Sequence, residues 1–204
     1  MDIQKIFILF MLPALAYGLG SIPWGLIVAR RLASVDIRKT GSGNIGATNV
    51  RRAGGNIPGV LTLAGDMLKG MLPVCLAIRL SGGGNGWGDL YISAIILAAF
   101  TGHLYPVYLK FRDGGKGVAT AAGCFLAISP LAVLITLSGF ILLVRGTRRV
   151  SVGSVGAAAI LPFAVRAAGG SGTITACAAL IGLGIVIRHR DNIRRLMAGT
   201  EPKI

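Results

Sequence analysis

Residues 41–52 concentrate side chains that can bind an oxyanion. Their sequence, GSGNIGATNVRR, holds three glycines, two hydroxyl groups, two asparagines and two arginines between long apolar segments. Glycine lets backbone N–H groups converge on a phosphate, hydroxyl and amide groups add uncharged donors, and guanidinium groups supply a forked positive charge. The stretch therefore predicts a phosphate site, although an ordinary polar turn between two membrane helices could have the same composition.

A second loop, at residues 110–117, combines glycines with basic residues in the sequence KFRDGGKG. It matches a nucleotide P-loop only in part, because Lys110 stands where the first glycine belongs and no Ser or Thr follows Lys116. We expect this loop to bind a phosphate but not to form a nucleotide site.

The tail at 188–195 adds His189, one of two histidines in the chain. Its arginine neighbours should lower the histidine pKa and favour the neutral ring, which can accept a proton. The alternative role for His189 is a hydrogen-bonding group that orients a partner, and both roles stay open.

Composition indicates a protein that crosses a membrane several times. Hydrophobic residues make up 53% of the 204 residues and charged residues only 14%, whereas a soluble domain carries about 25% charged residues. The excess of 21 Lys and Arg over 7 Asp and Glu could suggest a nucleic-acid partner. Outside the apolar segments, however, no basic stripe with interleaved aromatic residues is present. We therefore expect contact with the lipid bilayer and no nucleic acid.

Seven apolar segments predict an all-α bundle of transmembrane helices in a single domain, residues 1–204. The first is long enough to cross a bilayer core of about 30 Å, with a kink expected at residues 21–23. A polar, basic loop is expected over 32–56. The predicted segments are 4–31, 57–80, 89–109, 117–144 divided in two at Ser129-Pro130, 151–166 and 171–188.

The distribution of basic residues favours that division into a hairpin. If the chain turns back at Pro130, all four basic regions lie on one side, which the positive-inside rule makes cytoplasmic. This topology places the N-terminus outside and the C-terminus in the cytoplasm. Within the second segment, Asp66 and Lys69 lie about one helical turn apart and can form a pair that faces protein or water.

The positive-inside rule explains the arginines of the two loops but not their glycines. That surplus favours a phosphate site at the cytoplasmic interface, for a substrate with a phosphate head and an acyl tail. Carboxylates are scarce on that side, so a metal site or a two-carboxylate mechanism is poorly supplied, and we expect no metal or cofactor. The glycines stand at 41, 43, 46, 114, 115 and 117, and the carboxylates are Asp36, Asp113, Asp191 and Glu201.

Five strings carry a resemblance to a known family. They are GSIPWGLIVAR at 20–30, DIRKTGSGNIGATNVRRAG at 36–54, DMLKG at 66–70, GHLYPVYLKFRDGGKGVAT at 102–120 and RHRDNIRRLMAGTE at 188–201. The chain resembles, nearly end to end, the bacterial acyl-phosphate:glycerol-3-phosphate acyltransferases, the PlsY family. The resemblance implies a seven-helix enzyme of the bacterial inner membrane, with its active site on the cytoplasmic side and functional as a monomer.

By the same resemblance, the enzyme would transfer an acyl group from acyl phosphate to the C1 hydroxyl of sn-glycerol 3-phosphate. The products would be lysophosphatidic acid and inorganic phosphate. The implied catalytic residues are Ser42, Arg52, Lys116, His189 and Asn192. The implied substrate-binding residues are Gly41, Ser42, Gly43, Asn44, Thr48, Asn49, Arg52, Lys69, His103, Gly114, Gly115, Lys116 and Gly117.

Such a reaction needs neither a strong base nor a covalent acyl-enzyme, because an acyl phosphate is a mixed anhydride with a good leaving group. The hydroxyl proton could pass to His189 or to the phosphate of the substrate, and we favour the phosphate. A nucleophilic Ser42 is a weaker alternative. A transporter of phosphate-bearing solutes would need polar residues on several spans, whereas only Asp66 and Lys69 approach that pattern. A lipid-head phosphotransferase would need a carboxylate cluster for metal.

Overall fold

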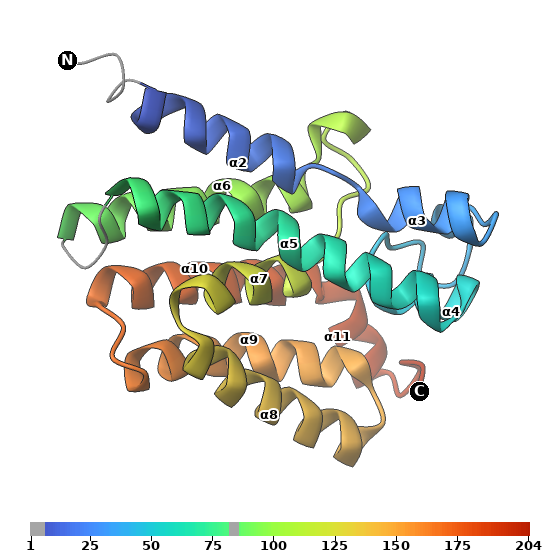
Figure 1. Ribbon diagram of the computed structural model, residues 1–204. Coiled ribbons are helices and arrows are strands. Elements are labelled where there is room, and N and C mark those ends of the chain that lie inside the picture. The colour runs from blue at the N-terminus through green and yellow to red at the C-terminus, as the bar shows by residue number, and fades with distance from the viewer. Residues whose placement is uncertain (1–6, 82–85) are drawn as a thin grey trace. The chain divides into compact units, whose positions relative to one another are not determined.

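The computed structural model describes residues 7–81 and 86–204, and every regular element in those ranges is a helix (Figure 1). The prediction of an all-α membrane protein is confirmed. The chain divides into two compact units, Met1–Cys124 and Phe125–Ile204. The single domain stays a prediction.

The first apolar span is broken near its end, as predicted. After the π-helical turn η1 (Phe7–Met11), α2 covers Leu12–Gly20 and α3 covers Trp24–Leu32. Pro23 separates them because it lacks a backbone N–H and disfavours helical geometry in the residue before it. The apolar stretch Leu9–Leu32 is long enough to cross a membrane, and its predicted first residues, 4–6, lie outside the described part.

The polar region after α3 is not a loop throughout, so the prediction for 32–56 is wrong in part. It contains a 3-10 turn, η2 (Ile37–Lys39), and an eight-residue helix, α4 (Ala47–Gly54). Ile37, Ile45 and Val50 are buried against Leu26 and Ala29 of α3. This small apolar cluster stabilises α4, and its scattered members are hidden in the sequence by the polar residues between them.

Two long helices complete the helical framework of the first unit. α5 (Asn56–Ser81) packs against α2, α3 and α6 (Gly86–Leu104), and α6 also packs against α2. The third span, predicted at 89–109, corresponds to the apolar stretch Gly86–Leu109, within which α6 ends at Leu104. Pro106 follows, and the 3-10 turn η3 (Val107–Leu109) precedes the glycine loop.

The apolar run 117–144 is divided where the sequence predicted. α7 (Val118–Ile128) ends before Ser129, whose side chain accepts a hydrogen bond from the N–H of Ala132, and α8 (Pro130–Thr147) begins with proline in its first turn. In the second unit, α8 packs against α9 (Val150–Ala167), and α9 packs against α10 (Gly172–Arg188). The tail forms a further helix, α11 (Arg190–Met197).

Among the described residues, five helices are long and apolar enough to cross a membrane. α10 and α11 together qualify as a sixth span bent by 57°, and α7 is apolar but shorter. A helix therefore lies at each of the seven predicted segments, but the number of segments that cross the membrane stays a prediction. Which side of the membrane each end faces stays a prediction.

Candidate active site

Asn49 organises the loop at residues 41–52. Its side chain is buried, and its Nδ2 donates to the carbonyl oxygens of Ile37 and Thr40 at 3.0 Å and of Asn44 at 2.9 Å. Its Oδ1 accepts a hydrogen bond from the backbone N–H of Ser42 at 3.1 Å. One amide therefore closes the loop, and the geometry gives Asn49 a positioning role. Direct substrate contact by Asn49 stays a prediction.

The glycines of this loop have a structural reason that the sequence did not reveal. Gly41 has a φ of +60°, and a side chain there would also collide with Oδ1 of Asn49. The amide N–H groups are partly used as well, since Gly46 donates to Oδ1 of Asn44 at 2.9 Å. The surplus of glycines is thus not by itself a sign of phosphate binding. Substrate contact by the glycines of this loop stays a prediction.

The exposed polar side chains lie in the loop before α4 and along α4 itself. Ser42, Thr48 and Arg52 are exposed, and Asn44 is half-buried. Thr48 and Arg52 are four residues apart on the helix, so the hydroxyl and the guanidinium lie on the same face. Together these groups offer neutral donors and one fixed positive charge to an oxyanion.

The loop carrying Lys116 is seated on the end of α6. The N–H of Gly115 donates to the carbonyl of His103 at 3.1 Å, and a side chain at Gly115 would collide with the His103 imidazole. Glycine is required at this close approach, because the loop backbone lies directly against the ring. The position of Lys116, which is half-buried, therefore depends on where α6 holds His103.

A buried ionic cluster holds His103 in turn. Lys69 Nζ lies 2.7 Å from Asp66 Oδ1, which confirms the predicted pair, and His103 Nδ1 lies 3.6 Å from the same oxygen. Lys69 also donates to the carbonyl of Ile22, at the break between α2 and α3, at 2.8 Å. The cluster joins α5, α6 and the broken span.

Lys69 and His103 are only 4% and 3% exposed. Their geometry indicates a positioning role, and direct substrate contact by these two residues stays a prediction.

In the second unit, His189 ends α10 with a fixed ring orientation. Its Nδ1 lies 2.8 Å from the carbonyl oxygen of Ile185, and its side chain is buried. A carbonyl oxygen only accepts, so Nδ1 carries the hydrogen. In the neutral ring Nε2 then holds the lone pair, and a backbone group orients the ring in place of a carboxylate.

Glu201 is a residue of this region whose role the sequence did not suggest. Its Oε1 accepts from Asn192 Nδ2 and its Oε2 from Arg195 Nε, both at 2.7 Å. Its backbone carbonyl accepts from Arg149 Nε at 3.2 Å. Burial alone would raise the pKa of Glu201, but hydrogen bonds from Asn192 and Arg195 and the Arg195 charge outweigh it and lower the pKa. The only sequence feature that could have suggested this role is that Glu201 is a lone carboxylate at the end of a basic tail.

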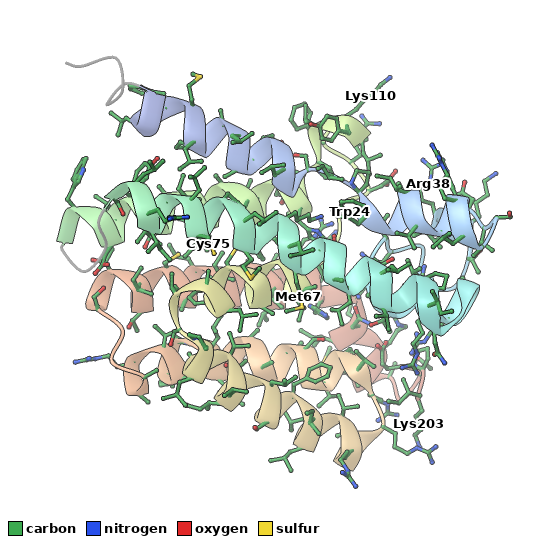
Figure 2. The ribbon with its side chains drawn as sticks, viewed as in Figure 1. Trp24, Arg38, Met67, Cys75, Lys110 and Lys203 are labelled. Atoms are coloured by element: carbon green, nitrogen blue, oxygen red, sulfur yellow. The ribbon has the colours of Figure 1, made fainter. Side chains whose placement is uncertain are left out.

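The predicted site residues thus fall into separate groups. In the first unit, one loop and helix α4 carry Gly41, Ser42, Gly43, Asn44, Thr48, Asn49 and Arg52. The same unit holds the 114–117 loop, whose Gly115 lies against His103, and the Lys69 pair. His189 and Asn192 belong to the second unit. Figure 2 displays the side chains on the ribbon.

Comparison with known proteins places this chain among acyltransferases. Residues 10–199 match the family model described as glycerol-3-phosphate acyltransferase. A protein of that name from Syntrophotalea carbinolica is 51% identical over 186 residues, covering 91% of this chain and 92% of the relative. Another from Geobacter sulfurreducens is 50% identical over 191 residues, covering 94% and 95%.

Two solved structures agree with the fold. A crystal structure of PlsY (YgiH), an integral membrane glycerol 3-phosphate acyltransferase, in its glycerol 3-phosphate form, superposes with a TM-score of 0.88 at 39% identity. The lysophosphatidic acid form superposes with a TM-score of 0.86 at 38% identity. Each comparison covers 95% of this chain and 94% of the solved chain.

Proposed function

Because the chain belongs to the glycerol-3-phosphate acyltransferase family, we propose that it transfers a fatty acyl group from acyl phosphate to the C1 hydroxyl of sn-glycerol 3-phosphate. The products would be lysophosphatidic acid and inorganic phosphate. The observation that carries the proposal is the exposed face formed by Ser42, Thr48 and Arg52, which Asn49 holds in a closed loop. Neutral donors beside one guanidinium suit a phosphate dianion.

In this proposal Arg52 and Lys116 each bind a different phosphate group. Arg52, with Ser42 and Thr48, would bind one phosphate through charge-assisted hydrogen bonds. Lys116 would bind the phosphate of glycerol 3-phosphate as a compact charge, since Gly115 and His103 place its loop. Asn49, Lys69 and His103 act through these residues and are positioning residues in the proposal.

The reaction is a direct transfer. The C1 hydroxyl oxygen attacks the acyl carbonyl carbon, the bond between that carbon and the phosphate oxygen breaks, and phosphate leaves with the electron pair. The hydroxyl proton passes to the departing phosphate. The protein contributes by holding the two substrates in contact and by neutralising charge that develops on oxygen.

His189 and Asn192, which belong to the second unit, are proposed as catalytic residues. With hydrogen on Nδ1, the neutral His189 ring can accept a hydrogen bond at Nε2 and so orient the attacking hydroxyl without removing its proton. His189→Gln keeps a hydrogen-bonding group and removes the base. Retention of most turnover with unchanged substrate binding would support transfer of the proton to phosphate, and loss of turnover alone would favour His189 as the base.

We test the donor and the acceptor together, by release of inorganic phosphate from purified protein in lipid. The substrates are palmitoyl phosphate and glycerol 3-phosphate, with acyl-CoA and acyl carrier protein thioesters as parallel donors. Release that requires both substrates and is abolished in Lys116→Ala supports the proposal. Turnover with a thioester alone would overturn the donor, and no turnover by folded protein would restore the transporter alternative.

Localisation and oligomeric state follow from the same proposal. We place the protein in the bacterial inner membrane, with its active site and C-terminus on the cytoplasmic side and each monomer complete. Modification by a membrane-impermeant thiol reagent of single cysteines at Ser129 and at Lys203 tests this topology. Equal access from the cytoplasm at both positions would contradict it.

A further inference from the structure

A hollow of about 350 Å³ opens on the first unit along α3, from the residue before the helix to its last turn. None of the residues implicated above in substrate binding lines it. Figure 2 shows Arg38 of this hollow next to α3. Its lining residues come from the break before α3, from α3 itself, from η2 and from η3, and are Pro23, Leu26, Ile27, Arg30, Arg31, Arg38 and Leu109.

The hollow carries a surplus of positive charge. Arg30 and Arg31 are exposed, and within the described residues neither forms a salt bridge. Arg38 is paired with Asp36, whose Oδ1 lies 3.1 Å from the guanidinium Nε, and the charge of Asp113 also acts on Arg38. In the described part of the chain, no carboxylate is within salt-bridge distance of Arg30 or Arg31, although the charges of Arg30 and Asp36 also act on each other. The charge complements an anion.

The rest of the lining is apolar, which indicates an amphiphile in place of a small ion. Leu26 is buried in the cluster beneath the loop, and Leu109 packs against that cluster. Ile27 is 41% exposed and presents an apolar surface beside the arginines. A phosphate ion would gain nothing from this floor, whereas methylene groups would be removed from water there.

The basic end of the hollow lies where a membrane span ends, which indicates that the amphiphile is a lipid of the bilayer. Arg30 and Arg31 are in the last turn of α3, at the end of the apolar stretch Leu9–Leu32. The end of a spanning helix lies at the level of the lipid headgroups, where anionic lipids attract basic residues. Leu32 is 58% exposed, so apolar surface continues to this level.

We propose that this hollow binds one anionic phospholipid of the surrounding bilayer. The lipid phosphate lies among Arg30, Arg31 and Arg38, and the glycerol and first methylene groups lie on Ile27 and Leu109. The site is distinct from the proposed active site. Its existence does not depend on the acyl-transfer reaction.

The test measures binding of a fluorescent phosphatidylglycerol to the purified full-length protein in detergent, with phosphatidylcholine as the neutral comparison. The first variant is Arg30→Gln/Arg31→Gln. Each basic residue near an anionic lipid is expected to contribute about fivefold in affinity. The variant, which lacks two of them, should therefore bind phosphatidylglycerol roughly 25-fold more weakly. The matched control, Arg145→Gln/Arg166→Gln, removes two exposed arginines from the last turns of α8 and α9 and should bind as the wild type does.

A second variant keeps all the arginines. Ile27→Glu introduces a carboxylate into the hollow and should weaken phosphatidylglycerol binding, whereas Ile141→Glu, at a similarly exposed position on α8, should not. If the target and control variants weakened phosphatidylglycerol binding equally, the loss would come from overall surface charge and not from this hollow. That result would overturn the proposal. Binding of phosphatidylcholine as tight as that of phosphatidylglycerol would also overturn it.

Competition separates the lipid from other phosphate sources. Millimolar inorganic phosphate should not displace phosphatidylglycerol, because the ion has no acyl chain to contact the apolar lining. Displacement by that ion would assign the hollow to a free anion and overturn the lipid proposal. Displacement by micromolar palmitoyl phosphate, with parallel loss of turnover in Arg30→Gln/Arg31→Gln, would assign it to the acyl donor and overturn the proposal as well.

Discussion

Two ion pairs of the first unit have nearly the same length and very different surroundings. Lys69 and Asp66 are 2.7 Å apart with side chains 2% and 3% exposed, whereas Arg38 and Asp36 are 3.1 Å apart with side chains 38% and 31% exposed. Burial, not distance, separates them. A charge buried without its partner is costly, while water replaces the partner of an exposed charge.

The buried pair also has structural connections that the exposed pair lacks. Lys69 reaches the carbonyl of Ile22, and Asp66 lies beside His103, on which Gly115 is seated. Arg38 and Asp36 are two residues apart and mainly stabilise their own turn. We therefore expect the buried pair to contribute more than the exposed pair to the stability of the protein and to its activity.

The largest effect is expected for Asp66→Ala. It leaves the Lys69 charge buried without a partner, which destabilises a protein by about 3–5 kcal/mol. The measurement is thermal unfolding in detergent, followed by tryptophan fluorescence.

The double variant Asp66→Leu/Lys69→Met is its control, since removal of both charges should restore much of the lost stability. If Asp66→Ala were as stable as the wild type, burial would not be what makes the Asp66–Lys69 pair important.

The next effect concerns the contact that joins the buried cluster to the Lys116 loop. Gly115→Ala places a methyl group against the His103 ring, and overpacking of this kind costs about 1–3 kcal/mol. We therefore expect the loop to shift and the KM for glycerol 3-phosphate to rise about fivefold or more. Steady-state kinetics at saturating acyl phosphate measure it.

Gly172→Ala is the matched control, because no atom lies within 4 Å of an added methyl group there. Equal KM values for Gly115→Ala and Gly172→Ala would show that the His103 cluster does not position the Lys116 loop.

An intermediate effect is expected for Glu201, whose side chain is 6% exposed while that of its partner Arg195 is 38% exposed. Glu201→Gln should lower the stability by about 1 kcal/mol at neutral pH, since charge-assisted hydrogen bonds are lost.

The pH dependence has a definite sign. The folded pKa of Glu201 is below its ordinary value of 4.5, so its stabilisation is present above that pH and is lost as the pH falls through the folded pKa. Wild type and Glu201→Gln should therefore converge in unfolding midpoint between pH 4.5 and more acidic values. A constant difference would contradict this. Asp191→Asn, at an exposed pair, is the control.

The smallest effect is expected for Asp36→Asn. The pKa of Asp36 is lowered by its hydrogen bonds with Arg38, but the pair is open to water, so the unfolding midpoint should not change measurably. The same variant releases Arg38 toward the hollow and should strengthen phosphatidylglycerol binding. A clear loss of stability would show that exposure is not what separates the two pairs.

Sequence patterns predicted the features that depend on local spacing. The apolar segments, the break at residues 21–23, the division at Ser129-Pro130 and the Asp66–Lys69 pair all follow from helix periodicity, proline geometry and hydropathy. The strings that matched the family also located the loops. These signals reside in neighbouring residues, so a single sequence carries them.

Other assignments required the folded chain. Helix α4 was predicted as loop, because its stabilising partners Leu26 and Ile37 are distant in sequence. The glycines at 41 and 115 were interpreted as a phosphate cradle, yet each is required by a close neighbour, Asn49 or His103. Spacing along the chain does not show what a backbone will pack against.

The sequence by itself determined the class of protein, the positions of its spans and the family, since composition, hydropathy and motif strings do not depend on three-dimensional contacts. Only the tertiary structure decided that Asn49 closes the first loop, that His103 seats the second and that Glu201 holds Asn192. The physical reason is that hydrogen bonds and steric contacts between distant residues depend on distances that exist only after folding.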